Sequence, residues 1–505
     1  MNDARTPPPG VAAADWAATP QAVRILVVAL QAQVVALQDQ VVAQQAQIVH
    51  VSGRLAALEE RAGRNSRNSA QPPSADPPSV PARPQRKRRG RKQGGQPGHA
   101  GHGRALLPPE QVDDRVEVKP LTCGGCGALL LGADPAPARR QVTELPRVAP
   151  VVTEYRQHTL TCQACGVTTT AAWPADVPAG SFGPRVAATV AYLTGRCGVS
   201  KREAQEILRA VCHLEVGLGS IAALEQQVSA AVATPVAAAQ AYVQAQPVVN
   251  ADETSWQQQR TGCWVWTAVT ALVTVFLMRA SRSGQSAKEL LGAGYAGIVG
   301  SDRYSAYTWL AVGQRQRCWA HLIRDFTALV DRGGASKALG TALLDATDDV
   351  FALWYRVRDG TLTRAAFSLA MAPQQGLIHA LLVCGQGIST EKTRRFCDNL
   401  LRLEPALWTF VRVPGVEPTN HSAERALRRA VLWRRRSFGT QSAAGSRFVE
   451  RILTTVTTLR QQERDVLDYL AAACHAVASG LPAPSLLPSP AADPSFVLEV
   501  LPAAA

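Results

Sequence analysis

The sequence lacks the features of a secreted protein. Its first ten residues, MNDARTPPPG, contain no apolar core of the kind that a secretion signal requires. Its 11 cysteines are an odd number, and four of them fall into two Cys-x2-Cys pairs, so they do not read as the disulfide framework of a small secreted domain. We therefore expect a cytoplasmic protein with reduced thiols.

A membrane span is the second feature that the sequence does not support. The uncharged run Thr261–Met278 has the 18 residues that a short span would need. Its β-branched residues and its break at Thr270–Leu272 favour a buried β-hairpin instead. We expect no membrane partner.

Acidic residues are scarce relative to basic ones. The 505 residues include 39 Asp and Glu against 53 Lys and Arg, which gives a formal net charge of +14. The excess is clustered, because residues 83–104 hold eight basic residues and no acid, and residues 424–436 hold six Arg and one acid. Such clusters predict an anionic partner, and DNA phosphates suit them. The basic residues assigned to DNA contact are Arg86, Lys87, Arg88, Arg89, Arg91, Lys92, Arg425, Arg428, Arg434, Arg435 and Arg436.

The N-terminal region shows a heptad pattern. Residues 1–20 are rich in Pro and Ala and are expected to be disordered, whereas residues 21–62 repeat apolar side chains every seven positions. The two seams are Val23, Leu30, Leu37, Val51 and Leu58, interrupted by Gln44, and Val27, Val34, Val41, Ile48, Leu55 and Ala62. This pattern favours a two-stranded parallel coiled coil and hence a homo-oligomer. A helix packed on the protein's own body is the alternative.

Residues 63–110 are rich in Pro, Gly and basic residues and hold few large apolar side chains. They cannot bury a core, so we expect a flexible linker whose basic run contacts phosphates. A linker that only improves solubility is the alternative.

Residues 111–180 contain the pairs Cys123–Cys126 and Cys162–Cys165, each followed directly by Gly. Four thiolates on two turns complete a tetrahedral site for one structural Zn²⁺. With a strand expected at Val151–Leu160, the segment predicts a zinc ribbon.

Residues 181–240 are expected to form three helices joined by short turns, with Ser200 capping the middle one. This order suggests a helix-turn-helix domain. A helical bundle that links two domains fits nearly as well, and the recognition helix is not assigned.

The stretch Gln246–Asp302 predicts a strand, a hairpin, a helix and a second strand. One strand leads into Asp252 and the other into Asp302, so the two carboxylates are aimed at a shared point. Glu253 is expected to face away from that point if the first strand continues through it.

A third acid, Glu424, lies on a predicted helix that also presents Asn420 and Arg428. Two Asp and one Glu can hold two Mg²⁺ or Mn²⁺ ions about 4 Å apart, which serve phosphodiester chemistry. The alternatives are structural: Asp252 caps a turn, Asp302 begins a helix, and Glu424 pairs with Arg428.

Seven features in chain order resemble those of transposases of the insertion sequence sixty-six family, over roughly residues 90–475. They are GGQPGHAGH, the two Cys pairs, ADETSW, GSDRYSAY, CWAH, NHSAER and LWRRRSFGT. The resemblance implies a DDE recombinase with an RNase H-like core, and it assigns Asp252, Asp302 and Glu424 as the catalytic metal ligands. Cys318 and His321 match a Cys-x2-His signature of related transposases and, with Asn420, are expected to support the site by positioning it. A second metal site at Cys318 and His321 is the alternative. The family's last motif often ends in Arg-Lys-Asn, whereas this chain keeps only the positive charge, as Arg434–Ser437.

The expected fold is a multidomain α/β protein. An RNase H-like mixed-sheet catalytic core, residues 241–332 and 415–445, carries a helical insertion at 333–414. It follows the coiled coil, the zinc ribbon and the helix-turn-helix-like domain. Closing helices are expected at 446–480 and a disordered tail at 481–505.

The expected function is that of a nucleoid-associated DNA transposase, which cuts at the ends of an insertion sequence and joins them to target DNA. Double-stranded DNA is its expected partner. The family's members usually lie beside two small accessory reading frames, whose products are further candidate partners. A catalytically inactive DNA-binding regulator and a related RNase H-like nuclease are the alternatives.

Overall fold

The computed structural model describes residues 6–62, 65, 68, 104–174, 177–178 and 180–488. The chain divides into two compact units: residues 1–83 with 321–345, and residues 84–320 with 346–505. The basic residues Arg86–Lys92 of the linker lie outside the described residues, as does the expected tail from residue 489.

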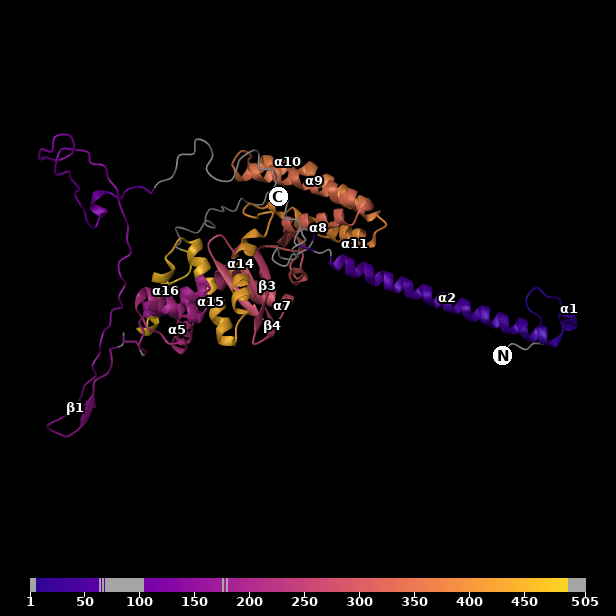
Figure 1. The fold of residues 1–505 in the computed structure, drawn as a ribbon, viewed down its shortest axis with the longest axis horizontal. Coiled ribbons are helices and arrows are strands. Elements are labelled where there is room, and N and C mark those ends of the chain that lie inside the picture. Colours follow the sequence, from indigo (N-terminus) through magenta and orange to yellow (C-terminus); the bar gives the residue numbers. More distant parts are fainter. Residues whose placement is uncertain are drawn as a thin grey trace, which may run out of the picture. The chain divides into compact units, whose positions relative to one another are not determined.

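The first unit begins with two helices. α1 (Ala13–Ala18) falls within the segment expected to be disordered, and its Trp16 is buried. The prolines of this segment favour disorder, but the short Ala-rich stretch among them has high helix propensity and one large apolar side chain to bury. α2 (Gln21–Ala62) is a single helix over the whole heptad segment (Figure 1).

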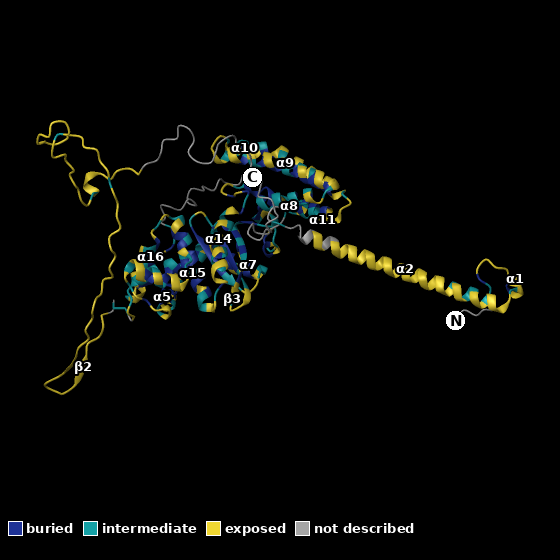
Figure 2. Cartoon of the chain, viewed as in Figure 1, coloured by how far each residue is buried: buried dark blue, intermediate teal, exposed yellow. Residues whose placement is uncertain are grey.

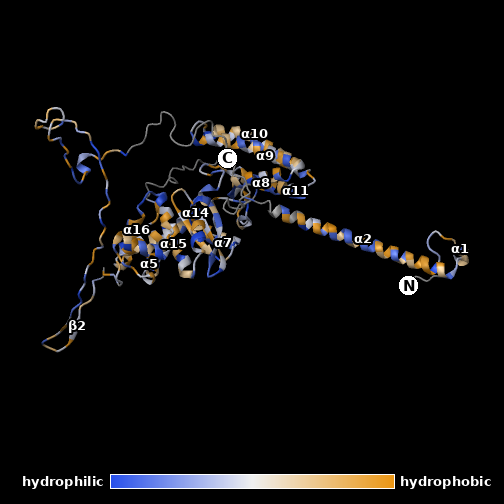
Figure 3. Ribbon diagram, viewed as in Figure 1, coloured by the Kyte–Doolittle hydropathy of each residue, from blue (hydrophilic) through white to orange (hydrophobic). Residues whose placement is uncertain are grey.

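Both apolar seams of α2 are exposed along the helix. Leu37 in the first seam is 60% exposed, and Ile48 in the second is 65% exposed. Figure 2 shows α2 almost entirely in the colour of exposed residues, and in Figure 3 the ribbon of α2 alternates between hydrophobic and hydrophilic colours. Among the described residues, none covers the apolar seam side chains between Leu30 and Leu58.

The second segment of the first unit holds α8 (Trp319–Asp331) and the start of α9 (Gly334–Arg358). The two helices pack closely at Gly340, where an added Cβ would lie 2.8 Å from the carbonyl oxygen of Phe326. Only glycine fits this approach, since the obstacle is backbone.

The second unit begins with the two cysteine turns and little regular structure. β1 (Thr159–Thr161) and β2 (Thr168–Thr170) form a short antiparallel hairpin. The strand expected over Val151–Leu160 is therefore wrong for most of its length, because β1 includes only its last two residues. Val151 and Val152 are exposed, so alternating β-branched residues here have no surface to pack on.

A helical bundle follows. It contains α3 (Pro184–Ala191), the π-helical η3 (Tyr192–Cys197), α4 (Lys201–Cys212), α5 (Leu218–Ala231) and α6 (Ala233–Gln244). Ser200 caps α4 as predicted, since its side chain accepts the N–H of Glu203 and the Glu203 carboxylate accepts the N–H of Ser200. α5 packs against α3 and α4, and also against the closing helices α15 (Ala443–Gln461) and α16 (Val466–Ala478).

The central sheet has five strands in the order β5-β4-β3-β6-β7. The strands are β3 (Val248–Gln258), β4 (Thr261–Val269), β5 (Thr274–Arg279), β6 (Ile298–Ser301) and β7 (Arg315–Arg317). β3, β4 and β5 run antiparallel, whereas β3, β6 and β7 run parallel, with α7 (Gly284–Leu291) between β5 and β6. The predicted order of strand, hairpin, helix and strand, in a mixed sheet, is confirmed.

Two boundaries differ from the sequence prediction. β3 does not end at Asp252 but runs on to Gln258, because it also forms the first arm of the hairpin with β4. The two turn residues, Gln259 and Arg260, have φ of 51° and 64°, as two-residue hairpin turns require. β7 is shorter than the predicted Val312–Cys318, because residues 312–314 form a 3₁₀ turn.

Helices cover both faces of the sheet. On one face, α14 (His421–Ser437) and α15 pack against Trp256, Val265 and Phe276. On the other, α6 and α7 pack against the alternate strand residues, which include Trp266 and Leu277. The run Thr261–Met278 lies in β4 and β5, as the hairpin interpretation predicted.

Residues between β7 and α14 are helical. After α8 and α9 come α10 (Arg364–Gln386), α11 (Glu391–Arg402) and the short α12 (Glu404–Leu407) and α13 (Thr409–Arg412). Two described helices, α2 and α10, are long and apolar enough to cross a membrane on length and composition alone. Core helices of soluble proteins and signal sequences meet the same criterion, so this is weak evidence for a span.

Candidate active site

Asp252 and Asp302 come from neighbouring parallel strands. In the register of β3 and β6, Asn250 lies opposite Gly300. Asp252 follows Asn250 by two residues, and Asp302 follows Gly300 by two residues. An added Cβ at Gly300 would lie 2.2 Å from Asn250 Oδ1, which explains the glycine before the second acid. The sheet thus places both carboxylates at the point where β6 ends.

α14 brings Glu424 to this point. Asn420, at the start of α14, is fully buried, and its side-chain amide donates to the carbonyl oxygen of Ala251 at 3.1 Å. Ala251 directly precedes Asp252. Glu424 lies one helical turn after Asn420, with its own N–H donating to the Asn420 carbonyl.

The other end of α14 is also tied to β3. Thr440 N–H donates to Gln257, and Gln259 N–H donates to Thr440, both at 2.9 Å. Gly439, between the helix and Thr440, has φ of 105°, and an added Cβ there would lie 2.1 Å from the Gln257 carbonyl oxygen. The Ser-Phe-Gly-Thr end of the LWRRRSFGT motif therefore holds the C-terminal end of α14 against β3.

Cys318 joins β6 to the start of α14. Its N–H donates to the carbonyl of Ser301, which precedes Asp302, at 2.9 Å. Its sulfur accepts the N–H of Asn420 at 3.2 Å and lies within 4.8 Å of a Glu424 carboxylate oxygen. Cys318 and Asn420 thus contact the backbone directly before both Asp residues. His321 follows three residues later on α8, where the chain passes into the first unit.

Asp252 lies in an acidic and buried environment. Burial raises the pKa of Asp252 well above its usual range, and Glu253, Asp302 and Glu424 raise it further. The N–H of Glu253, which donates to Asp252 Oδ1 at 2.9 Å, opposes this shift. Carboxylates gathered in this way need a cation to balance them, and their oxygens are the donors that Mg²⁺ and Mn²⁺ prefer. The residues therefore fit a divalent metal.

The basic side chains around the site differ in what they contact. Arg317 is buried and donates to the Asp302 carbonyl, and burial lowers its pKa to about 10. Arg434 contacts β3 through Thr254 Oγ1 at 3.2 Å and through Ser255. The other assigned arginines of α14 have exposed side chains; they are Arg425, Arg428, Arg435 and Arg436.

The two cysteine turns have the same local geometry. In each, the N–H of the first Cys donates to the residue five positions on, and the Gly after the second Cys donates back to the first. Gly127 and Gly166 have φ of 75° and 77°, which explains the glycine at this position. Backbone N–H groups lower the pKa of the Cys123 and Cys162 thiols, which favours the thiolate that binds metal.

Each turn forms separately. No three of the four paired cysteines lie together among the described residues. The chemistry of the four thiols fits zinc.

Family models match most of the described chain. The model described as "Transposase IS66 family" matches residues 179–447, which is more than half of the chain. The chain belongs to this family. The "zinc-finger binding domain of transposase IS66" matches residues 120–166, which include both cysteine turns. Residues 18–105 match a family of unknown function. The chain is thus a transposase, a class of enzyme that acts on DNA, with a zinc-finger DNA-binding domain.

Two proteins of Sinorhizobium fredii are similar to this transposase. "Uncharacterized protein y4hP" is 25% identical over 405 residues, which cover 72% of each chain. "Uncharacterized protein y4qI" is 29% identical over 209 residues, which cover 38% of each chain.

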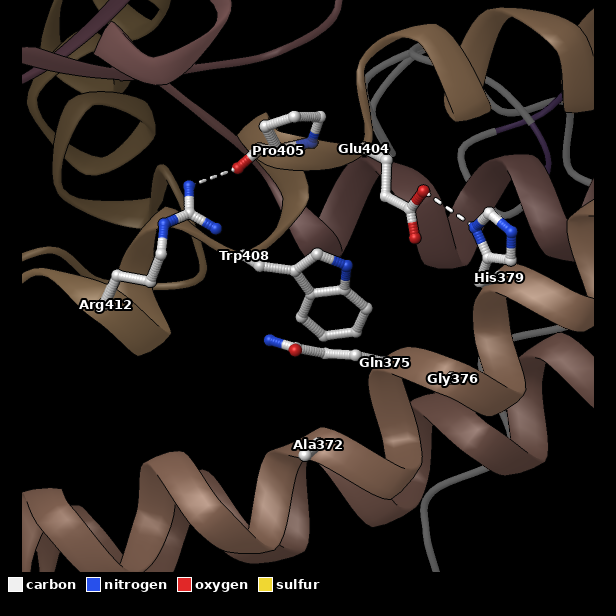
Figure 4. A pocket seen from close by; sticks show the side chains of 8 residues that line it. All are labelled: Ala372, Gln375, Gly376, His379, Glu404, Pro405, Trp408 and Arg412. Atoms are coloured by element: carbon white, nitrogen blue, oxygen red, sulfur yellow. Dashed lines mark hydrogen bonds and ion pairs between the residues drawn. The ribbon is translucent and has the colours of Figure 1, made fainter.

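The transposase also has a cavity in its helical insertion. It has a volume of about 460 Å³ and is lined by residues of α10, α12 and α13 and by Trp408. Figure 4 shows His379 bonded to Glu404 on one side of Trp408 and Arg412 bonded to Pro405 on the other. None of the three acids lines this cavity.

Sequence reasoning missed three residues that contact the acids or their neighbours. Arg282 and Tyr307 bond to Glu253, and Tyr304 N–H donates to Asp302 Oδ1 at 2.8 Å. The two tyrosines lie in the GSDRYSAY motif, two and five residues after Asp302, so their spacing was a usable signal. Arg282 lies in a loop with no such signal.

Proposed function

We propose that this transposase is a DDE enzyme with an RNase H-like core, in which Asp252, Asp302 and Glu424 hold two Mg²⁺ or Mn²⁺ ions. The observation that carries the proposal is geometric: parallel β3 and β6 bring Asp252 and Asp302 to one point, and the sulfur of Cys318, which directly follows β7, lies within 4.8 Å of a Glu424 carboxylate oxygen. In the sequence, 122 positions separate Asp302 from Glu424, and the contacts of Cys318 and Asn420 hold the two parts of the chain together.

The chain's own groups prepare the site for DNA strand cleavage and strand transfer. Asp252 and Asp302 each commit one oxygen, Oδ1, to a backbone N–H, which orients the carboxylate toward the site. Bound metal ions would activate the attacking water or 3′-hydroxyl and stabilise the leaving oxygen. The buried Arg317 donates to the Asp302 backbone and supports that end of the site.

DNA binding is assigned to surfaces around this core. The exposed arginines of α14 begin one residue after Glu424, so phosphates near the reacting bond lie within their reach. We assign the basic residues of the linker, from Arg86 to Lys92, to sequence-independent phosphate contact. The bundle of α3, α4 and α5 is the candidate helix-turn-helix domain, with double-stranded element ends and target DNA as partners.

Metal and oligomer assignments complete the proposal. Cys123, Cys126, Cys162 and Cys165 share one structural Zn²⁺ when the two turns come together. The exposed seams of α2 pair with those of a second copy in a coiled coil. The products of accessory reading frames are further candidate partners, and a nucleoid location follows from DNA binding.

The test replaces each acid by its amide. Asp252→Asn, Asp302→Asn and Glu424→Gln keep shape but remove charge from the metal ligands. Cleavage and strand transfer should each fall at least about a hundredfold, or roughly 2.7 kcal/mol of transition-state stabilisation. Binding to DNA that carries the element's ends should remain, because the zinc finger and the basic segments are unchanged.

Glu417→Gln is the matched control. Glu417 is exposed and lies seven residues before Glu424, so its replacement should leave both reactions unchanged. Normal cleavage by Glu424→Gln would contradict the assignment. A wild-type protein that binds end DNA without cutting it would point to a regulator, and one that cuts without joining would point to a nuclease.

A further inference from the structure

Glu253 lies beside the first acid of the site but on the other face of β3. Because side chains alternate along a strand, Asp252 faces α14 and Glu253 faces the layer of α7. The Glu253 side chain is 0% exposed, although it carries a carboxylate. A charged group in this position needs compensation from close partners.

Two partners satisfy this carboxylate. Arg282 donates to Glu253 Oε1 from Nε at 2.8 Å and from Nη2 at 2.6 Å. The Tyr307 hydroxyl donates to Oε2 at 2.9 Å. Arg282 comes from the loop between β5 and α7, and Tyr307 from the segment after β6, so Glu253 joins three parts of the chain.

The contacts continue from Arg282 to the second acid. The Arg282 guanidinium lies over the ring of Tyr304, 3.7 Å from its centroid, and the Tyr304 hydroxyl donates to the Arg282 carbonyl at 2.6 Å. Tyr304 N–H in turn donates to Asp302 Oδ1 at 2.8 Å. A continuous path of contacts therefore runs from Glu253 through Arg282 and Tyr304 to a metal-binding carboxylate.

Stability alone does not account for this arrangement. Burying an ion pair costs desolvation that its attraction only roughly repays, and apolar side chains of similar size often serve a core as well. The Glu253–Arg282 pair also lies near other acids. Asp302 is close enough for its negative charge to raise the pKa of Glu253. A buried carboxylate at Glu253 is explained if it helps to hold the neighbouring acids of the candidate active site in position.

We propose that Glu253 is a positioning residue of the metal site, which acts through Arg282 and Tyr304 to fix the Asp302 carboxylate. The inference rests on the proposed function, because it assumes that Asp302 binds metal. Glu253 itself does not touch the reacting atoms. Its loss allows the segment after β6 to shift, so that Asp302 binds metal less well while the DNA-binding surfaces remain.

The experiment measures cleavage by the full-length protein as a function of Mg²⁺ concentration, with Mn²⁺ in parallel. Glu253→Gln weakens the contact with Arg282, and Tyr304→Phe removes the hydroxyl but keeps the ring under the guanidinium. Each should raise the Mg²⁺ concentration needed for half-maximal rate about tenfold, and Mn²⁺ should restore part of the activity. End-DNA binding should not change.

A double variant separates this role from a contribution to folding. If Glu253 and Tyr304 act on the same path, Glu253→Gln with Tyr304→Phe should shift the Mg²⁺ requirement little more than either change alone. The matched control is Glu289→Gln. Glu289 is exposed on the nearby α7 and forms an ion pair with Arg279, so removing its charge should leave the Mg²⁺ requirement unchanged.

The outcomes are distinguishable. An inactive Asp302→Asn together with a wild-type Mg²⁺ requirement in both Glu253→Gln and Tyr304→Phe would overturn this inference alone. An active Asp302→Asn would overturn the proposed function as well. If Glu253→Gln does not fold, Tyr304→Phe decides, because it removes one hydroxyl and no charge: a raised requirement supports the path and an unchanged one rejects it.

Discussion

The sheet core and the segment of residues 104–174 use the same kinds of hydrogen bond but hold their shape for different reasons. In the core, Val249, Trp266 and Val299 are fully buried between helices. Within residues 104–174, all of which the structure describes, no side chain is buried. Local backbone bonds shape each cysteine turn, and nothing packs over them.

This difference teaches where each region's stability comes from. Apolar burial stabilises the core without any ligand, at about 25 cal/mol per Å² removed from water. The cysteine turns have no such contribution, and we propose that a metal ion shared by both turns supplies it. The same reasoning applies to α2, and we propose that a second chain covers its exposed seams.

The largest effect should come from removing one zinc ligand. We expect purified protein to hold about one tightly bound zinc equivalent, and Cys162→Ser to lose it, since three thiolates do not complete the site. Metal analysis of the two proteins checks this. The unfolding transition of the core should not move, because no residue of this segment is buried.

Cys197→Ser is the control for that experiment. Cys197 is exposed but belongs to neither pair, so its replacement should leave the zinc content unchanged. Full zinc content in Cys162→Ser would show that the two turns do not share one ion.

The next effect concerns α2. A peptide of residues 21–62 should be helical and dimeric, and its helicity should fall on dilution. Lys at both Val34 and Val41 would place charge in the second seam and should leave the peptide monomeric. Sedimentation and circular dichroism over a concentration series measure both properties.

Lys at the positions of Gln33 and Gln40 provides the control, because these residues lie outside both seams and carry no apolar side chain. A wild-type peptide that stays monomeric at high concentration would leave only packing on the protein's own body.

The smallest effect tests the core. Glu450 on α15 is half-buried, and burial raises the pKa of its carboxyl to about 7, against the influence of Arg279. Because the folded-state pKa lies above the unfolded value of about 4.5, the unfolded chain loses this proton first as pH rises. Wild-type stability should therefore fall between about pH 4.5 and pH 7.

Glu450→Gln should remove that fall. Relative to wild type, the variant should be roughly 1–2 kcal/mol more stable at pH 8 than at pH 5, as measured by denaturant unfolding. The exposed Glu206 on α4 is the control, and Glu206→Gln should show no such difference. Equal pH dependence in Glu450→Gln and wild type would contradict the assignment.

Local patterns predicted much of the fold. The hairpin of β4 and β5 is visible in its Trp, Val and Thr content, and Ser200 is visible as a helix cap. Predictions from local sequence patterns were wrong where the structure of a segment depends on whether another strand lies beside it. β3 continues past Asp252 because β4 pairs with it, and most of Val151–Leu160 is not a strand because nothing lies beside it.

The candidate site shows the same limit. The order of acids along the chain pointed to Asp252, Asp302 and Glu424, but the contacts that place them are long-range. No local signal relates Cys318 to Asn420, which lie 102 residues apart, or Glu253 to Arg282. Such pairs become visible only when strands and helices from distant parts of the chain are packed together.

The contacts between Cys318 and Asn420, and between Trp319 and Pro418, also close a long loop at its base. The chain between Trp319 and Pro418 therefore starts and ends at neighbouring points beside the candidate active site. The length of this segment is thus not coupled to the position of Glu424. The entropic cost of closing such a loop grows only logarithmically, by about 0.6 kcal/mol for each doubling of length. The helical insertion can therefore gain or lose whole helices over evolution while the chemistry at its base stays in register.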